Sequence, residues 1–420
     1  MSMQRYMTYR DSGAEWIGEI PEGWKSKRLK YLASSRVAPT DANEGDYLGL
    51  DSVQSWTMRI CKKEEASADG AGILYDSECV LFGKLRPYLA KVALPENSGP
   101  CSSEFLVLMP KAVTRKYLAY LLSSESFIDE VNSLTYGVRM PRAGWDLIGN
   151  IQIPVPPAPE QQAIINYLDF RTAEIDSLVA DCEREVGLLQ EYRKAVITEV
   201  ITKGLDPDVP MKDSGVEWIG VIPEGWLVRP AKTLFVEGRE LRRPNDEQCT
   251  ASQKYGIIPQ AQYTALENQR MVAADKNLDA WKHVEPGDFV ISLRSFQGGL
   301  ELSTIAGCVT WHYIVLQGNC LVESAYYKYL FKTRKYIESL QRTCTYIRDG
   351  QDLRYSNFVQ VPLLLPPRKE QIEIGAYLDA KTAEIDSLID AKQSMADKLR
   401  EYRKSLVSEA VTGKFKVPGA

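Results

Sequence analysis

The chain has 420 residues, of which 44% are hydrophobic and 25% are charged, with a net charge of −5 at pH 7. This length allows two to four globular domains. The negative net charge argues mildly against nucleic-acid binding, but it does not exclude a local basic face. No apolar run approaches the ~18–20 residues of a membrane span, and the eight cysteines contain no C-x-x-C pair, so we expect a cytoplasmic protein with no membrane partner, metal site or disulfide framework.

A short tryptophan-rich segment opens the chain and returns near its middle. Asp11–Trp24 reads DSGAEWIGEIPEGW and Asp213–Trp226 reads DSGVEWIGVIPEGW, with 12 of 14 positions identical. A second pair of matching segments is Leu168–Leu178 and Leu378–Leu388, and each is followed by the motif EYRK. The chain therefore contains an internal duplication of a unit of about 205 residues. Repeated units tend to pack against each other through their shared surfaces.

A variable body follows each tryptophan-rich segment, and both bodies are predicted to be rich in β-strands. The apolar runs that predict buried strands are Glu78–Phe82, Glu104–Met109, Asp288–Ser292 and His312–Leu316. Cys79 and Phe289 are 210 positions apart, the same offset as in the helical words. The bodies therefore keep a common strand spacing while their sequences diverge. We interpret Glu104 and His312, which precede equivalent strands, as structural.

Basic loops recur at equivalent positions of the two bodies. They are Gly83–Tyr88 and Tyr136–Arg142 in the first body, and Leu293–Gly299 and Tyr346–Arg354 in the second. Each loop alone is also typical of a solvated turn, but the recurrence favours a function. Arg and Gln read base edges, Lys and Tyr bind phosphates, and the glycines of the third loop would allow close backbone approach to a phosphate. The candidate DNA contacts are Lys84, Arg86, Tyr88, Arg139, Arg142, Arg294, Ser295, Gln297, Arg348 and Arg354.

A proline hinge ends each body and opens a long helix. From Glu160 to about Thr202 there is no proline and one glycine, and apolar residues recur with a heptad period, as they do in the second copy. Roughly 40 residues make a rod of about 60 Å, whose natural partner is the other rod, running antiparallel. A plain amphipathic surface helix is the alternative. The predicted seam of the helix pair is Ile165, Leu168, Ile175, Val179, Val186, Leu189, Val196, Leu378, Ile385, Ile389, Leu399 and Leu406.

Polar and extra apolar residues add detail to the predicted helix pair. Polar residues that interrupt the seam at matched places usually fix its register, and here they are Thr172 with Thr382 and Arg193 with Arg403. The apolar residues off the seam include Ile164, Leu178, Leu188, Ile197 and Ile201. Either further helices or the chain's own bodies could pack on them.

The C-terminal tail predicts a cyclic arrangement. Thr412–Pro418 resembles Thr202–Pro210, which leads directly into the second tryptophan-rich segment. The chain therefore ends where its first tryptophan-rich segment would begin, and we expect Asp11–Trp24 beside the end of the second helix.

Catalytic motifs are not found in the sequence. It has no phosphate loop ending in Gly-Lys-Ser/Thr, no dinucleotide fingerprint, no H-E-x-x-H and no methyltransferase signature of the Asn/Asp-Pro-Pro-Tyr/Phe type. The two histidines, His283 and His312, have no counterpart in the first copy. We therefore expect a chain without catalytic residues, cofactor or metal.

The sequence motifs of this chain, in their order, resemble those of the specificity subunit of type I restriction-modification systems over essentially the whole chain. The resemblance rests on DSGxEWIGxIPEGW, the hinge PPAPEQQ, the helix words TAEIDSL and EYRK, and the loops FGKLRPY and SLRSFQGG. It implies an α+β fold with pseudo-two-fold symmetry, in which two mixed α/β target-recognition domains are separated by two long antiparallel coiled-coil helices. The implied parts are a conserved N-terminal segment (1–24), a recognition domain (25–155), a spacer helix (156–204), a linker repeat (205–226), a second recognition domain (227–365), a second spacer helix (366–412) and a tail (413–420).

The resemblance also implies partners. Each recognition domain would read one half of a bipartite, asymmetric double-stranded DNA target, and the helices would dock two methyltransferase (modification) subunits. Restriction (endonuclease and translocase) subunits would join outside these, and catalysis would belong to the partners. The alternative function is a coiled-coil scaffold whose variable domains bind proteins, and a nuclease with an unrecognised site is a third hypothesis.

Overall fold

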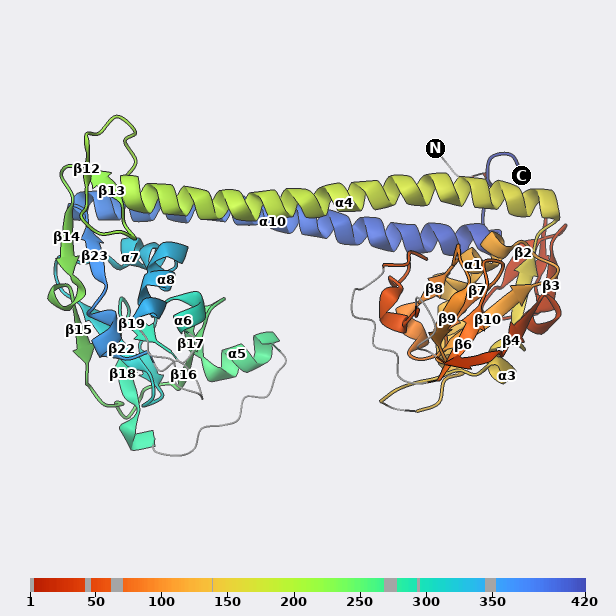
Figure 1. Ribbon diagram of the computed structural model, residues 1–420, viewed down its shortest axis with the longest axis horizontal. Helices are drawn as coiled ribbons and strands as arrows, with labels where there is room; N and C mark the ends of the chain where they lie inside the picture. Colours follow the sequence, from red (N-terminus) through yellow and green to blue (C-terminus); the bar gives the residue numbers. More distant parts are fainter. Residues whose placement is uncertain are drawn as a thin grey trace. The chain divides into compact units, whose positions relative to one another are not determined.

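The computed structural model describes residues 4–41, 47–61, 71–137, 139–267, 278–292, 295–343 and 353–420. The chain divides into two compact units. Unit 1 contains Met1–Arg184 and Lys392–Ala420, and unit 2 contains Glu185–Ala391. Each long helix contributes one half to each unit, so a unit consists of a body and the two half-helices that it contacts (Figure 1).

Unit 1 combines short strands with short helices. Its strands are β1 (Tyr9–Asp11), β2 (Glu19–Pro21), β3 (Lys25–Arg28), β4 (Ala33–Arg36), β5 (Pro39–Asp41), β6 (Ala71–Tyr75), β7 (Val80–Gly83), β8 (Val92–Ala93), β9 (Gly99–Ser102), β10 (Phe105–Pro110) and β11 (Gln152–Val155). Its short helices are α1 (Arg115–Leu122), α2 (Glu125–Ser133) and α3 (Trp145–Ile148), with 3-10 turns η1 (Leu29–Tyr31), η2 (Leu50–Ser52) and η3 (Pro87–Leu89).

The central sheet of unit 1 is buried on both faces. Its order is β4-β10-β7-β8, with antiparallel neighbours. Successive side chains of a strand point to opposite faces, so Phe82 and Leu108 join the large core with α1 and both long helices, whereas Leu81 and Val107 join a smaller core on the other face. This two-sided burial explains why the sequence shows continuous apolar runs here instead of alternation.

Unit 2 repeats this plan. Its strands are β12 (Met211–Asp213), β13 (Val221–Pro223), β14 (Leu227–Pro230), β15 (Phe235–Gly238), β16 (Cys249–Ser252), β17 (Gly256–Pro259), β18 (Lys282–Val284), β19 (Phe289–Ile291), β20 (Glu301–Leu302), β21 (Gly307–Val309), β22 (Ile314–Gly318) and β23 (Pro362–Leu365). Its short helices are α5 (Gln260–Glu267), α6 (Ser295–Gly298), α7 (Ser324–Leu330), α8 (Arg334–Arg342) and α9 (Tyr355–Phe358), with 3-10 turns η4 (Ala231–Thr233) and η5 (Leu278–Ala280). The sheet order β15-β22-β19-β20 matches that of unit 1 strand for strand.

Two long helices, α4 (Ala158–Lys203) and α10 (Arg368–Val411), pack together, as the heptad pattern predicts. In unit 1 the first half of α4 packs against the last turns of α10, and in unit 2 the last half of α4 packs against the start of α10, so the helices run antiparallel within each unit. The seam residues that are buried are Ile165, Leu168, Ile175, Leu378, Ile385, Ile389 and Leu406. Those that are half-buried are Val179, Val186, Leu189, Val196 and Leu399.

The matched polar residues of the seam serve two different contacts. Arg193 pairs with Asp386 of the other helix at 2.8 Å, and Arg403 pairs with Asp176 at 2.9 Å, so the arginines do link the helices in one register. The threonines do not. The hydroxyl of Thr382 lies 3.0 Å from the hydroxyl of Tyr329, a residue of the body, and Thr172 lies equivalently against Tyr120. Their role is to hold a body tyrosine on the helix.

The apolar residues off the seam separate into two groups. Ile164, Ile197 and Ile201 are buried in the cores that the helices share with their own bodies. Leu178 and Leu188 are exposed on the helix surface, at 42% and 64%. The bodies therefore account for the first group only.

The hinge places one buried glutamine in each unit between the body and the long helix. The amide oxygen of Gln161 accepts a hydrogen bond from the backbone N–H of Thr114, at the start of α1, and its amide nitrogen donates to the carbonyl of Pro156. Gln371 makes the same two contacts with Glu323 and Pro366. One side chain thus ties a body helix to the first turn of a long helix.

The tryptophan-rich segment lies beside the end of α10, which confirms the predicted cyclic arrangement. Lys414 donates from its ammonium to the carbonyls of Ile17 and Glu19, and the backbone N–H of Lys416 donates to the carbonyl of Gln4. Gly413 has φ +72°, and a Cβ there would lie 2.5 Å from Cδ of Pro21. Glycine is therefore required where the chain leaves α10 and passes the segment.

Candidate nucleic-acid interface

The two basic loops of unit 1 are joined by backbone hydrogen bonds. Arg86 donates its N–H to the carbonyl of Pro141 at 2.7 Å, and Leu85 forms a bridge with Arg142. Tyr136 and Arg142 exchange two N–H to carbonyl bonds of 3.1 Å, which closes the second loop. Residues that are about 50 positions apart in the sequence thus form one continuous surface at the end of β7.

Most candidate side chains of unit 1 lie on the outside of this surface. Arg86, Tyr88 and Arg139 are exposed and Lys84 is half-buried. Arg86 sits in the left-handed region at φ +50°, immediately before η3. We call Lys84, Arg86, Tyr88 and Arg139 the basic surface of unit 1. It combines cations with an aromatic hydroxyl, the residue types that bind phosphates and base edges.

Arg142 differs from the other candidates because its guanidinium is already paired. Its Nη2 and Nε lie 2.8 Å and 3.2 Å from the two carboxylate oxygens of Glu104, at the start of β10. The two-point contact holds the second loop against the sheet, which agrees with a structural role for Glu104. We therefore assign Arg142 to the positioning of the loops.

The candidates of unit 2 are only partly described. Arg294 and Arg348 lie outside the described residues. Gln297 is exposed on α6, and Arg354 is exposed immediately before α9. The amide of Asn357 in α9 donates to the carbonyl of Thr343, which fixes the C-terminal side of the second loop on the end of α8.

Two expectations for the third loop need correction. Ser295 is 1% exposed, and its hydroxyl accepts the backbone N–H of Ser292 at 2.8 Å, so the side chain stabilises the turn instead of facing solvent. The glycines do not leave room for a phosphate. A Cβ on Gly299 would lie 2.1 Å from the carbonyl oxygen of Phe331, so this glycine permits close packing inside the body.

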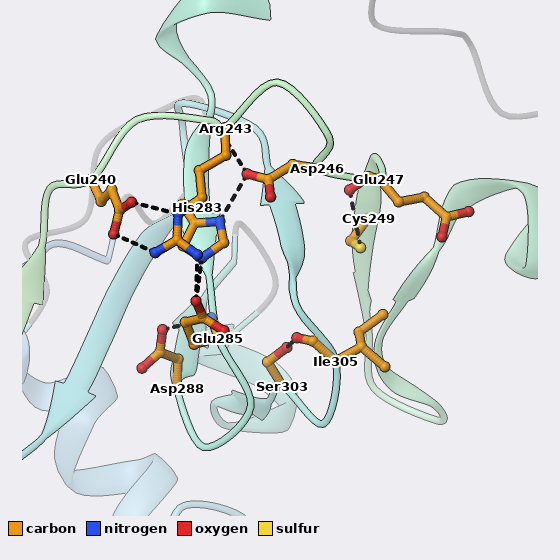
Figure 2. Close-up of polar contacts among 10 residues, drawn as sticks. All are labelled: Glu240, Arg243, Asp246, Glu247, Cys249, His283, Glu285, Asp288, Ser303 and Ile305. Carbon is orange, nitrogen blue, oxygen red and sulfur yellow. Dashed lines mark hydrogen bonds and ion pairs between the residues drawn. The ribbon is translucent and has the colours of Figure 1, made fainter.

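An ionic cluster around the buried His283 in unit 2 was not anticipated from the sequence. Figure 2 shows the imidazole of His283, on β18, between Asp246 at 2.8 Å and Glu285 at 2.9 Å. The guanidinium of Arg243 contacts Glu285 and Glu240 in the same group. Burial alone lowers the pKa of His283, but the two carboxylate hydrogen bonds outweigh it and raise the pKa above its ordinary value. The cluster therefore favours the protonated form of His283 and ties the loop at residues 240–246 to β18.

Neither a metal centre nor a membrane span can be assigned to the part of the chain that the structure describes. No group of three or more His, Cys, Asp or Glu side chains in those residues could hold a metal ion. Within the same residues, no helix is both long and apolar enough to cross a membrane.

Comparison with known proteins shows which family the chain resembles. Residues 21–178 match the family described as the type I restriction modification DNA specificity domain. Over 96% of its length the chain is 23% identical to the putative type I restriction enzyme MjaX specificity subunit of Methanocaldococcus jannaschii, and the match covers 96% of that protein. Over almost its whole length the chain is therefore similar to type I restriction-modification specificity subunits. The match to the type I restriction enzyme EcoDI specificity subunit of Escherichia coli, 22% identical, covers 44% of this chain and 42% of that protein.

The fold agrees with this family. A chain in a structure described as the "structural basis underlying complex assembly and conformational transition of the type I R-M system" superposes with a TM-score of 0.71 at 18% identity, covering 93% of this subunit and 98% of that chain. The HsdS subunit from Thermoanaerobacter tengcongensis superposes with a TM-score of 0.52 at 19% identity, covering 94% and 98%. Both superpositions show that this chain shares the fold of those proteins.

Proposed function

We propose that each unit reads one half of a split, asymmetric DNA target. The observation that carries this proposal is the basic surface of unit 1, where two loops from separate parts of the body are joined into one surface with exposed cations. The same strand plan recurs in unit 2 with different side chains at the equivalent loops. Two equivalent scaffolds with different donors suit two different half-sites.

We further propose that the helix pair docks the methyltransferase subunits. Large apolar side chains stay exposed along both helices, and such residues on a charged helix surface are typical of protein interfaces. They are Phe170, Leu178, Leu188, Tyr192, Ile372, Tyr377, Leu388, Met395 and Tyr402. Because two of these positions recur in both copies, Leu178 with Leu388 and Tyr192 with Tyr402, we expect two methyltransferase subunits for each specificity subunit, with restriction subunits outside them.

Substitution of Arg139 by alanine tests the DNA-reading part of the proposal. If Arg139 reads a base, binding of the cognate duplex should weaken by roughly 1–3 kcal/mol, and base preference should relax in one half-site only. If Arg139 contacts a phosphate, affinity should fall evenly for all duplexes. The slope of the logarithm of the binding constant against the logarithm of salt concentration should then become shallower by about 1. Binding would be measured against duplexes that carry a scrambled first or second half-site.

Lys111 supplies the matched control. It is exposed, and it follows the opposite end of β10 from the loops. Lys111→Ala removes the same charge from the same body and should leave both affinity and salt slope unchanged. Equal binding by the Arg139→Ala, Arg86→Ala and Lys111→Ala proteins would remove the basic surface from the DNA interface.

A further inference from the structure

One loop of the first body docks on the helix pair in a strained conformation. Residues 54–59, which we call the Trp56 loop, follow η2 and are closed by the N–H of Gln54 donating to the carbonyl of Arg59. Trp56 has φ +68° and Met58 has φ +60°, in the region that residues with side chains rarely adopt. Such strain persists only where surrounding contacts hold the backbone in place.

The contacts that hold the Trp56 loop come from α10 and α4. Arg403 donates from Nη1 to the carbonyl of Trp56 at 2.6 Å, and the ammonium of Lys404 lies 4.2 Å from the centre of the indole ring. Arg59 reaches Asp176 at 3.1 Å, the same carboxylate that pairs with Arg403. A carbonyl, an aromatic face and a cation of the loop are thus all engaged by the helix pair.

The same docking platform exists in unit 2, because the residue types recur 210 positions apart. Arg193, Lys194 and Asp386 correspond to Arg403, Lys404 and Asp176. The ion pair of Arg193 with Asp386 forms, but these side chains are 35% and 50% exposed, against 9% and 13% for Arg403 and Asp176. The difference in exposure shows that the platform is covered in unit 1 and open in the described part of unit 2.

A cavity occupies the open platform. Its volume is about 640 Å³. The residues that line it are Gln190, Arg193, Lys194, Lys254, Asp386, Ile389 and Asp390. All but Lys254 belong to the helix pair, and among them are the counterparts of the residues that hold the Trp56 loop. The described bodies therefore differ in how they attach to the helices, although the helices offer both the same contacts.

We propose that Trp56 is a positioning residue that fixes the orientation of the first recognition domain on the helix pair, and that the described residues of the second domain make no such contact with the equivalent platform of unit 2. The inference rests on the proposed function, since its consequence concerns how half-sites are read. Each additional contact that holds a domain on the helix pair narrows the range of gaps between half-sites that the protein accepts. Trp56 would therefore control gap selectivity without contacting DNA.

The test uses the full specificity subunit in its complex with the methyltransferase subunits. Binding would be measured on duplexes that keep both half-sites and vary the gap by one base pair at a time. Trp56→Ala should reduce the preference for the best gap roughly three- to tenfold, the size expected for loss of one half-buried cation–π contact, while base preference within each half-site stays the same. Trp56→Phe keeps an aromatic face for Lys404 and should restore most of the preference.

Matched variants on the helices separate docking from misfolding. Lys404→Ala leaves the Trp56 loop sequence intact and should broaden gap tolerance as Trp56→Ala does, whereas Lys194→Ala, at the equivalent platform of unit 2, should not. Wild-type gap preference in a folded Lys404→Ala protein would overturn the proposal. Equal broadening by Lys194→Ala would overturn the difference between the units.

Amide hydrogen exchange gives a readout that does not depend on DNA. The backbone N–H of Trp56 donates to the carbonyl of Ala90, so exchange at Trp56 should accelerate in Lys404→Ala and not in Lys194→Ala. Unchanged exchange would overturn the docking of the loop itself. A wild-type complex that shows no gap preference, yet accelerated exchange in Lys404→Ala, would instead contradict the proposed bipartite reading.

Discussion

Single side chains decide which loop residues can meet DNA. Arg142 and Ser295 have the residue types of DNA contacts, but Arg142 is engaged by Glu104 and Ser295 is buried in its own turn. Arg86 and Arg139 remain exposed beside them. The distinction depends on partners contributed by distant parts of the chain, such as Glu104 for Arg142. Residue type and spacing alone do not reveal such partners.

His283 should make the stability of unit 2 depend on pH. The folded-state pKa is raised, so its stabilisation is complete below the unfolded value of about 6.5 and is lost as pH rises through the folded pKa. His283→Gln should therefore destabilise the protein by about 1–3 kcal/mol near pH 6 and by less near pH 8. Denaturant unfolding at both pH values measures this. An equal loss at the two pH values would show that the charge of His283 is not involved.

Substitution of Gly413, with Gly204 as the comparison, tests the contact between the chain after α10 and the tryptophan-rich segment. Both end a long helix with positive φ, so alanine is strained at either position. At Gly413 the new Cβ would also clash with Pro21, whereas at Gly204 its nearest neighbour is at an ordinary 3.4 Å. Gly413→Ala should destabilise unit 1 by roughly 1–3 kcal/mol, and Gly204→Ala should destabilise unit 2 by less. Equal losses in thermal unfolding would contradict the close contact with the tryptophan-rich segment.

At the scale of elements, the sequence predicted those helices and strands whose burial leaves a recognisable pattern of apolar residues. The long helices were predicted within a few residues because one face is apolar and the other charged. The strands β7, β10, β19 and β22 were also located, since a short apolar run between turn residues has few alternatives. Helices α1 and α7 were not predicted. Tyr117–Leu122 of α1 is buried on every side, so it shows no amphipathic period.

The joining of the basic loops could not be predicted for a related reason. It depends on Arg86 meeting Pro141 across the end of the sheet, which is set by tertiary register and not by either loop sequence. The buried role of Gln161 and Gln371 was likewise missed, although their repetition in both hinges was a usable signal. A repeated polar residue at the start of a helix indicates a shared buried contact.

Shortening both helices together tests whether they set the gap between half-sites. Leu178–Arg184 and Ala396–Tyr402 both lie next to the Asp176–Arg403 contact, and Glu183 pairs with Arg400 between them. Deleting both heptads removes about 10 Å of rise from each helix while the flanking pairs stay in register. The preferred gap should contract by about three base pairs, measured by binding to a gap series.

A length-preserving exchange controls for altered sequence in this experiment. Substituting two exposed residues of the same heptad, Leu178→Gln and Arg184→Gln, keeps seven residues and the buried seam and changes the surface only. The gap should then stay the same. An unchanged gap in the folded double deletion would show that the helices do not set the spacing.

At the scale of the whole molecule, the two copies of the duplicated unit share one scaffold and differ in their surface loops. Sheet order, hinge glutamine and helix-ending glycine recur in both units, and these are the features that hold a body on the long helices. The loops at the sheet ends differ in sequence. The conserved features therefore serve attachment, and the divergent ones are available for specificity.

The central claim is that the two units read two different half-sites of one target. Methylation-site sequencing of a host that carries this specificity subunit with its methyltransferase tests it most directly. We expect a single motif made of two unlike half-sites separated by a gap of fixed length, on one orientation of the duplex. A continuous or palindromic motif would contradict the account.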